Sequence, residues 1–208
     1  MTSTFQTAKQ LMYARKSVRK YKEGVMIPKE VLHQLIEDAI SAPSSSNMQP
    51  WRFLVIQDQD VKNELLPIAN NQQQVATCSA LIAVLGDLEM YERSEEIYQA
   101  NVDLGVMPQE VADMMIANSR KLYSSLPQDV LKSIVSFDAG LVSMQFMLLA
   151  KEMGYDTVTM GGFNKVQFAQ YFNLPANEIP IVLIALGEAV TPAHGTSRIG
   201  AEKITRFI

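Results

Sequence analysis

Residues 134–154 read I-V-S-F-D-A-G-L-V-S-M-Q-F-M-L-L-A-K-E-M-G, and this stretch does most to decide the fold. Its apolar side chains recur at helical spacing on more than one side, within a pattern that spans residues 126–153. Gly154 follows at a position where glycine commonly ends a helix. A helix that is apolar nearly all round is buried, either by its own domain or by a partner subunit. The sequence therefore predicts one long central helix.

Shorter patterns surround this helix. Apolar runs predict four strands, at residues 51–56, 80–85, 157–160 and 181–186. Helical spacing predicts helices at residues 5–13, from Pro28 to Ala42, and at residues 61–68 and 166–172. Residues 89–125 are polar and mostly helical, so we interpret them as an excursion that covers another part of the molecule. Because no repeat or Gly/Ser/Pro-rich linker divides the chain, we predict one α+β domain over residues 1–208.

The composition excludes several classes of protein. The 208 residues are 48% hydrophobic, enough for one substantial core, and the net charge of −4 gives no electrostatic footprint for nucleic acid. The single cysteine, Cys78, allows neither an intrachain disulfide nor a thiolate metal cluster. Residues 1–10 carry no apolar stretch of a signal peptide, and we expect no apolar run of the roughly 20 residues that a membrane span needs. We therefore expect a cytoplasmic protein that binds neither membrane nor nucleic acid.

The usual catalytic motifs are missing from the sequence. His33 and His194 do not make a convincing metal site with Cys78, and His33 falls on the polar side of its helix, where solvent is its expected neighbour. The sequence has no dinucleotide-binding glycine motif, no Walker loop and no nucleophile elbow. The chemistry would then have to come from a bound cofactor.

Three segments are candidates for binding such a cofactor. The first is Arg15-Lys16-Ser17-Val18-Arg19, where two guanidiniums and a hydroxyl alternate along an extended stretch. Arginine offers a planar fork of donors that suits a terminal phosphate, and serine adds another donor. A solvated basic turn after a helix is the other interpretation, because cations are also favoured at helix C-termini.

The other two segments are a loop and a glycine pair. Residues 43–50 read P-S-S-S-N-M-Q-P, so hydroxyl and amide side chains lie between two prolines. This segment is either a hydrogen-bonding edge for a heterocycle or an ordinary helix-to-strand loop. Gly161 and Gly162 follow the third predicted strand. Paired glycines let backbone approach a flat ligand closely, although a simple tight turn has the same sequence.

The order of these motifs is more specific than any one of them. R-K-S-V-R lies near the start, P-S-S-S-N-M-Q-P-W-R-F follows the second helix, and D-A-G-L-V-S-M-Q-F-M-L-L-A-K-E-M-G-Y lies in the long helix. M-G-G-F precedes the fourth strand, and I-V-L-I-A-L-G-E-A lies near the end. In this order, and over essentially the whole chain, the sequence resembles the nitroreductase family of FMN enzymes.

The resemblance implies an α+β fold with a mainly antiparallel sheet flanked by helices, in an intertwined homodimer that shares two FMN sites. It assigns roles to residues of this chain. Arg15 and Ser17, with Lys16 between them, match the positions that hold the flavin phosphate, and Arg198 matches a basic residue that returns to it. Arg19, Asn71 and Gln74 match positions beside the pyrimidine edge of the ring. In the family, the partner subunit contributes a loop to the site. That loop corresponds here to Pro43, Ser44, Ser45, Ser46 and Asn47, and Gln49 lies close by. Gly161 and Gly162 match positions whose backbone N–H groups face N5 and O4.

Two positions depart from the family pattern. Gln74 stands where a basic residue is common, and Thr196 stands at a second basic position, two residues before Arg198. Positive charge near N1 stabilises anionic reduced flavin, so its loss would lower the reduction potential of the flavin.

By resemblance, the reaction is a ping-pong oxidoreduction in which NAD(P)H passes hydride to flavin N5 and a nitroaromatic, quinone or similar oxidant takes the electrons. No side chain has to act as a nucleophile or catalytic acid, because the flavin N5 carries the chemistry. We expect residues 89–125 to form the lid that sets substrate choice. Candidates to line it are Tyr91, Tyr98, Met107 and Tyr123, although core packing explains each of them equally well.

Two other functions fit parts of the pattern. An FMN storage or sensor protein would keep Arg15, Ser17 and Arg198 but close the flavin face to other substrates. A helical interaction module would use the apolar helix around residues 141–153, which a dimeric enzyme also needs.

Overall fold

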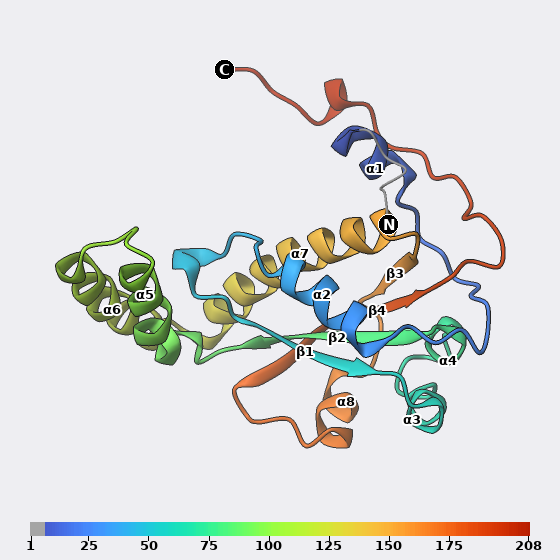
Figure 1. Ribbon diagram of the computed structural model, residues 1–208, viewed down its shortest axis with the longest axis horizontal. Coiled ribbons are helices and arrows are strands. Elements are labelled where there is room, and N and C mark those ends of the chain that lie inside the picture. Colours follow the sequence, from blue (N-terminus) through green and yellow to red (C-terminus); the bar gives the residue numbers. More distant parts are fainter. Residues whose placement is uncertain (1–6) are drawn as a thin grey trace.

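Four strands form one antiparallel sheet in the order β1-β2-β4-β3 in the computed structural model, which describes residues 7–208 (Figure 1). The strands are β1 (Trp51–Ile56), β2 (Ala80–Asp87), β3 (Asp156–Met160) and β4 (Glu178–Gly187). All four were predicted from the sequence, and the mainly antiparallel α+β fold is confirmed. β2 and β4 lie in the centre, where every residue of β2 is buried. Such a continuous apolar run is typical of a strand covered on both faces.

Helices cover both faces of the sheet. The described helices are α1 (Ala8–Ala14), α2 (Lys29–Ala39), α3 (Gln59–Glu64), α4 (Gln74–Thr77), α5 (Ser94–Asp103), α6 (Gln109–Ser124), α7 (Gln128–Glu152) and α8 (Lys165–Tyr171). One turn of 3-10 helix each forms at Ser45–Asn47, Met90–Arg93 and Ala201–Lys203. Alternate β2 residues point to opposite faces: Ile82 packs with α2 and α7, whereas Leu81 packs with α8 and the segment around α3 and α4. The result is three layers, with the α5–α6 pair at one end of the sheet (Figure 1).

The central helix is α7, as predicted. It crosses the face that α2 also covers, and Gly154, with φ of +91°, follows its C-cap as expected of a helix-ending glycine. α7 is also long and apolar enough to cross a membrane by length and composition, which corrects the expectation that no run of that length exists. Nine of its residues, Asp138 among them, are buried within this chain, so α7 is a core helix of the fold described here.

Several helix boundaries differ from the prediction, among them the end of α2, which lies at Ala39 rather than at Ala42. Phe5, which the sequence assigns to the first helix, lies outside the described residues. α3 begins earlier and ends earlier than predicted, at Gln59 and Glu64. Asp58 caps its start by accepting from Val61 N at 3.0 Å, and Pro67 disfavours helical geometry at the residue before it. α4 was not predicted, because four residues carry no periodic signal.

Candidate functional site

The basic segment lies against the edge of β3. After α1 ends, Arg15 is extended, and Ser17 forms an isolated parallel bridge with Thr157. Val18 N donates to Thr157 O at 3.1 Å, and the Val18 side chain is buried. Because side chains alternate along extended backbone, Arg15, Ser17 and Arg19 face away from the buried side of Val18. Lys16 shares the side of Val18, and both line a separate cavity of about 370 Å³, so the structure sets Lys16 apart from the other three.

Two polar atoms on these paired segments are buried without a hydrogen-bond partner among the described residues. They are Arg15 Nε and Thr157 Oγ1. A buried guanidinium nitrogen is rarely left unpaired, since its desolvation costs free energy that no contact then offsets. An anion beside Arg15 would supply the missing acceptor. The segment therefore fits a phosphate group better than it fits a solvated turn.

Gly161 and Gly162 lie at the other end of the same strand edge. A Cβ added at Gly161 would meet no heavy atom within 4 Å, and one added at Gly162 would meet only Asn70 Nδ2 at 3.9 Å. The space in front of them is therefore open to a flat ligand. Gly161 follows Thr157 by four positions, which is about 13 Å of extended chain. A phosphate site and a planar-ring site thus flank one edge of β3.

The segment between α3 and α4 supports the glycines. Asn70 Nδ2 and Gln72 Nε2 donate to Gly162 O at 2.8 and 3.0 Å. Gln74 is buried and its Nε2 contacts Met160 Sδ at 3.3 Å, next to Gly161 in sequence. Asn71 is exposed in the left-handed region, with φ of +55°. Sequence reasoning missed Asn70 and Gln72; the amide-rich run N-N-Q-Q-Q at residues 70–74 was the only signal for them.

The loop at residues 43–49 lies elsewhere, on the N-terminal half of α7. Ser45 donates to the buried Asp138 through both its backbone N and its Oγ, at 3.0 and 3.1 Å. Gln49 N donates to Ser44 Oγ at 3.0 Å. Burial raises the pKa of Asp138 above its ordinary value, although the two bonds from Ser45 oppose that shift. Pro43, Ser46 and Asn47 are exposed at the tip of the loop.

The loop and the glycines of one chain do not come together. Asp138, which holds the loop, lies 14 residues before the end of α7 at Glu152, which is about 21 Å of helix. The loop contacts α5, α6 and α7, whereas Gly162 contacts the segment between α3 and α4, and Figure 1 shows α3 and α4 at the end of the sheet away from α5 and α6. Arg198 lies apart from both groups, exposed in the C-terminal segment, where its Nη1 donates to Thr196 Oγ1 and Ser197 O. One chain therefore presents half-sites.

The excursion at residues 89–125 forms α5 and α6, and two of its tyrosines contact the loop. Tyr98 and Tyr123 were predicted as candidates to line a lid, but both are buried. Tyr98 Oη donates to Ser46 O and Tyr123 Oη donates to Ser46 Oγ, each at 2.8 Å. Both residues therefore pack in a core cluster, the alternative that the sequence left open, and they also contact the loop. Tyr91 and Met107 are half-buried.

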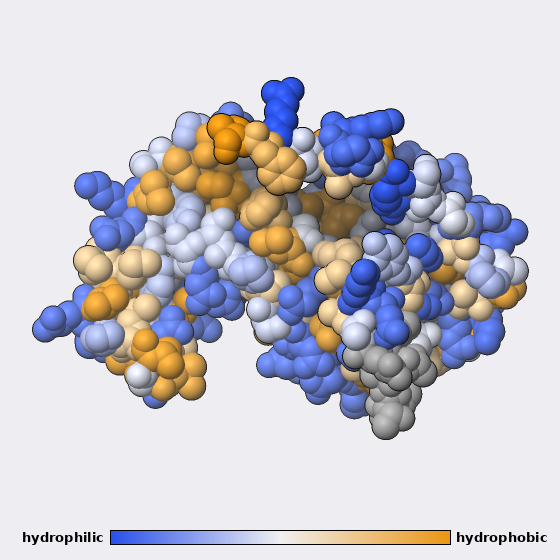
Figure 2. Space-filling model, turned by 90° about the horizontal axis from the view of Figure 1, so that it is seen from above, coloured by the Kyte–Doolittle hydropathy of each residue, from blue (hydrophilic) through white to orange (hydrophobic). Residues whose placement is uncertain are grey.

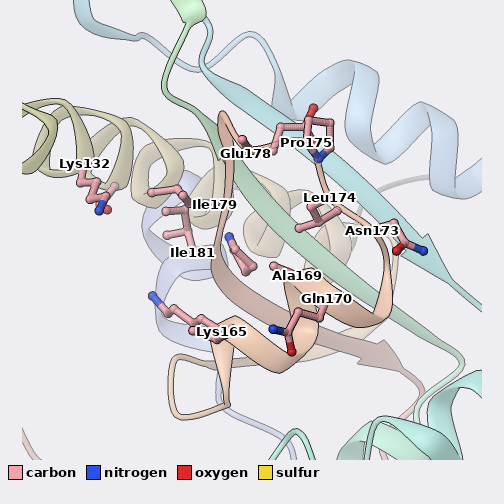
Figure 3. Close-up of a pocket in the computed structure, with 14 residues that line it drawn as sticks. Lys132, Lys165, Ala169, Gln170, Asn173, Leu174, Pro175, Glu178, Ile179 and Ile181 are labelled. Atoms are coloured by element: carbon pink, nitrogen blue, oxygen red, sulfur yellow. The ribbon is translucent and has the colours of Figure 1, made fainter.

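The cavity drawn in Figure 3 is not this site. It has a volume of about 690 Å³ and lies between α8, β4 and the first half of α7, with Lys132 and Lys165 beside apolar residues such as Ile181. None of the predicted cofactor-binding residues lines it.

Cys78 and His33 lie in contrasting surroundings, the first buried and the second exposed. Burial raises the pKa of the Cys78 thiol to about 11, so the reactive thiolate is scarce at neutral pH. Within residues 7–208, no group of three or more His, Cys, Asp or Glu side chains is placed to hold a metal ion. His33 is exposed, as expected.

Comparisons with known proteins identify the family of this chain. The family model described as Nitroreductase family matches residues 12–188. YdgI of Bacillus subtilis strain 168, whose name assigns it provisionally to the NAD(P)H nitroreductases, is 42% identical over 95% of this chain and 96% of its own.

Two solved structures match over the whole length of this chain. The first, from Exiguobacterium sibiricum, is provisionally named a nitroreductase and was crystallised in complex with FMN; it is 40% identical, covers 100% of both chains and has a TM-score of 0.92. The second, from Staphylococcus epidermidis, is provisionally named an NAD(P)H:FMN oxidoreductase; it is 33% identical, covers 100% of this chain and 98% of its own, and has a TM-score of 0.95. With the family model matching most of the chain, this protein belongs to the nitroreductase family.

Proposed function

We propose that this protein is an FMN-dependent NAD(P)H oxidoreductase of the nitroreductase type. The observation that carries the proposal is the edge of β3, where a buried, unpaired Arg15 Nε lies at one end and the open Gly161 at the other. A solved structure that matches this chain over its full length was crystallised in complex with FMN, which makes FMN the candidate ligand for this edge. Bound FMN supplies two-electron transfer from NAD(P)H to a nitroaromatic, a quinone or a similar oxidant.

The residues of this chain have binding and orienting roles. Arg15 and Ser17 hold the phosphate, because a guanidinium and a hydroxyl make charge-assisted hydrogen bonds to its oxygens. Gly161 and Gly162 leave room for the ring, and Asn70 and Gln72 fix the backbone of Gly162. Arg19, Asn71 and Gln74 lie along the route from the phosphate end to the ring edge. Arg198 reaches the phosphate once the C-terminal segment is held by a partner.

We propose a homodimer as the working unit, because a second copy is what brings the loop of one chain to the β3 edge of the other. α7 keeps an unpartnered apolar strip in this chain: Phe137 is 66% exposed and Met144 is 37% exposed. Gly140 lies between them, and a Cβ there would meet nothing within 4 Å. Figure 2 shows apolar side chains gathered around a hollow in the middle of one face of the molecule. A helix strip with a small residue at its centre suits close approach of another helix.

The two departures from the family pattern bear on the potential of the flavin. Gln74 is a neutral amide whose Nε2 already contacts Gln72 and Met160. Thr196 accepts from Arg198 and so orients that guanidinium without adding a charge. With fewer cations near the ring, reduced flavin is less stabilised than in relatives that have them. We also propose that residues 1–208 form one domain and that the protein is cytoplasmic, in keeping with its single, buried Cys78.

The test is a visible absorption spectrum of the purified protein, followed by anaerobic addition of NADH and, separately, of NADPH. We expect flavin bands that bleach with at least one donor and return when a quinone is added. Flavin bands that persist with both donors would overturn the enzyme assignment in favour of FMN storage or sensing. Absence of flavin, even after incubation with FMN, would overturn both.

A further inference from the structure

The loop at residues 43–49 is held from three helices at once. Asp138 of α7 accepts two hydrogen bonds from Ser45, Tyr98 of α5 donates to the Ser46 carbonyl, and Tyr123 of α6 donates to the Ser46 hydroxyl oxygen. Ser119 Oγ lies 3.3 Å from Tyr98 Oη, which fixes that hydroxyl from the far side. These partners lie between 52 and 93 residues from the loop in sequence.

The loop is also anchored by its apolar residue. Met48 is 1% exposed and packs in one cluster with Tyr98, Tyr123 and Val135. The core of the α5–α6 pair is thus built around a side chain of the loop. Removing the excursion would leave Met48 without its cover and Ser46 without two hydrogen bonds.

The backbone of the loop needs this support. Ser46, Asn47 and Gln49 all have positive φ, between +47° and +56°. L-residues other than glycine rarely adopt this left-handed region, and serine gains no special relief there. Because the hydrogen bonds to Ser46 are made in that conformation, they favour it over the extended alternatives.

The direction of one hydrogen bond also decides what Ser46 offers to a ligand. Tyr123 Oη donates to Ser46 Oγ, so the Ser46 hydroxyl proton is not used in that contact. Ser46 is itself exposed. Its hydroxyl is thus set to donate outward, and the ring nitrogens and carbonyl oxygens of a flavin are acceptors.

We propose that Tyr98 and Tyr123 are positioning residues of the flavin site, which hold Ser46 so that its hydroxyl donates to the flavin bound by the partner chain. The α5–α6 excursion is then a support for the shared site rather than only a lid over it. This inference rests on the proposed function, since it needs FMN at the β3 edge of a second copy.

A double-mutant cycle on the FMN dissociation constant tests the proposal. Tyr123→Phe and Ser46→Ala each remove the same hydrogen bond, so each is expected to weaken FMN binding roughly two- to tenfold. Because they share one interaction, the double variant should be weaker by clearly less than the product of the two single effects. Tyr98→Phe removes the bond to the Ser46 carbonyl, and because Tyr98 is proposed to act through the same hydroxyl, its effect should also be smaller in the Ser46→Ala background than in the wild type. Tyr171→Phe, which removes the hydroxyl that contacts Glu64 far from the loop, is the matched control and should leave FMN binding unchanged.

Two further measurements separate the possible outcomes. Urea unfolding of each flavin-free variant reports stability, and a merely structural tyrosine would lower stability while leaving the FMN dissociation constant unchanged. Unchanged FMN binding in Tyr123→Phe, or fully multiplicative effects with Ser46→Ala, overturns the positioning role even though wild-type flavin still bleaches with NAD(P)H. If the wild type binds no FMN, the proposed function itself fails and this inference fails with it.

Discussion

Ser17 pairs with Thr157 as an isolated parallel bridge, and this contact aligns the basic segment with β3. The bridge sets Arg15 and Gly161 toward opposite ends of a single strand edge. Their spacing along the edge comes from backbone pairing rather than from side-chain contacts. Substitutions at either end are therefore expected to change ligand binding with little effect on the pairing.

Arg15→Ala should weaken FMN binding by about 1.5–3 kcal/mol, the usual loss for a hydrogen bond to a charged group. The phosphate of FMN loses a hydrogen-bonding partner. The variant also no longer contains the Arg15 guanidinium, whose Nε has no hydrogen-bond partner among the described residues of the chain. Fluorescence titration of FMN, which is quenched on binding, gives the dissociation constant. Lys9→Ala, on the exposed part of α1, is the control. An unchanged dissociation constant for Arg15→Ala would show that the segment is a solvated turn.

Gly161→Val should abolish flavin binding while the protein stays folded. A side chain there meets nothing in this chain, so the loss comes from the space that the ring needs. Gly86→Ala is the contrasting variant, because its Cβ would lie 2.0 Å from Val135 Cγ1 and must disturb the core. Thermal unfolding and flavin occupancy, measured on both, should show opposite patterns. Full occupancy in Gly161→Val would remove the glycines from the site.

Gly140→Leu should convert the dimer to monomers. Glycine in a helix interior costs about 1 kcal/mol relative to alanine, so the substitution favours α7 itself. The added side chain blocks only what approaches from outside this chain. Sedimentation velocity would detect the change in mass, with Glu152→Ala at the exposed end of α7 as control. A Gly140→Leu protein that remains dimeric would place the interface elsewhere.

The pH dependence of stability should reveal the buried Asp138. Burial raises the pKa of this carboxyl in the folded protein above its ordinary value of 3.8, so its charge is disfavoured by folding. The cost is fully present above the folded pKa and is relieved as the pH falls through that pKa toward the unfolded value. Relative to Asp138→Asn, which cannot titrate, the wild type should therefore gain stability as the pH is lowered from neutral. Urea unfolding of both proteins across that range measures their free energies of unfolding, and a wild type that loses stability relative to Asp138→Asn, or keeps a constant difference from it, would contradict the expectation.

The elements with a strong period were predictable from the sequence. All eight residues of β2 are buried and its first six, residues 80–85, form an apolar run, and α7 carries apolar residues on several sides. The ends of α3 were not predictable from spacing, because a cap at Asp58 and the proline at position 67 decide them. The family resemblance identified the loop and the glycines as candidate binding residues. The structure adds the side chains that hydrogen-bond to them.

What the sequence could not supply are contacts between distant segments. The left-handed backbone at Ser46 depends on tyrosines 52 and 77 residues away, and no local pattern encodes such a pairing. The same holds for Asn70 and Gln72, which reach Gly162 from about 90 residues before it. For Tyr98 and Tyr123 the sequence left lid lining and core packing equally open, and their burial agrees with core packing.

The placement of the loop and of the β3 edge in different parts of one chain has a genetic consequence. In the dimer that we propose, each site takes its edge from one chain and its loop from the other. When an Arg15→Ala chain pairs with a chain damaged in the loop, both defects fall in one site and the other site is intact. Two inactive alleles expressed together should thus complement each other, restoring one working site in every mixed dimer.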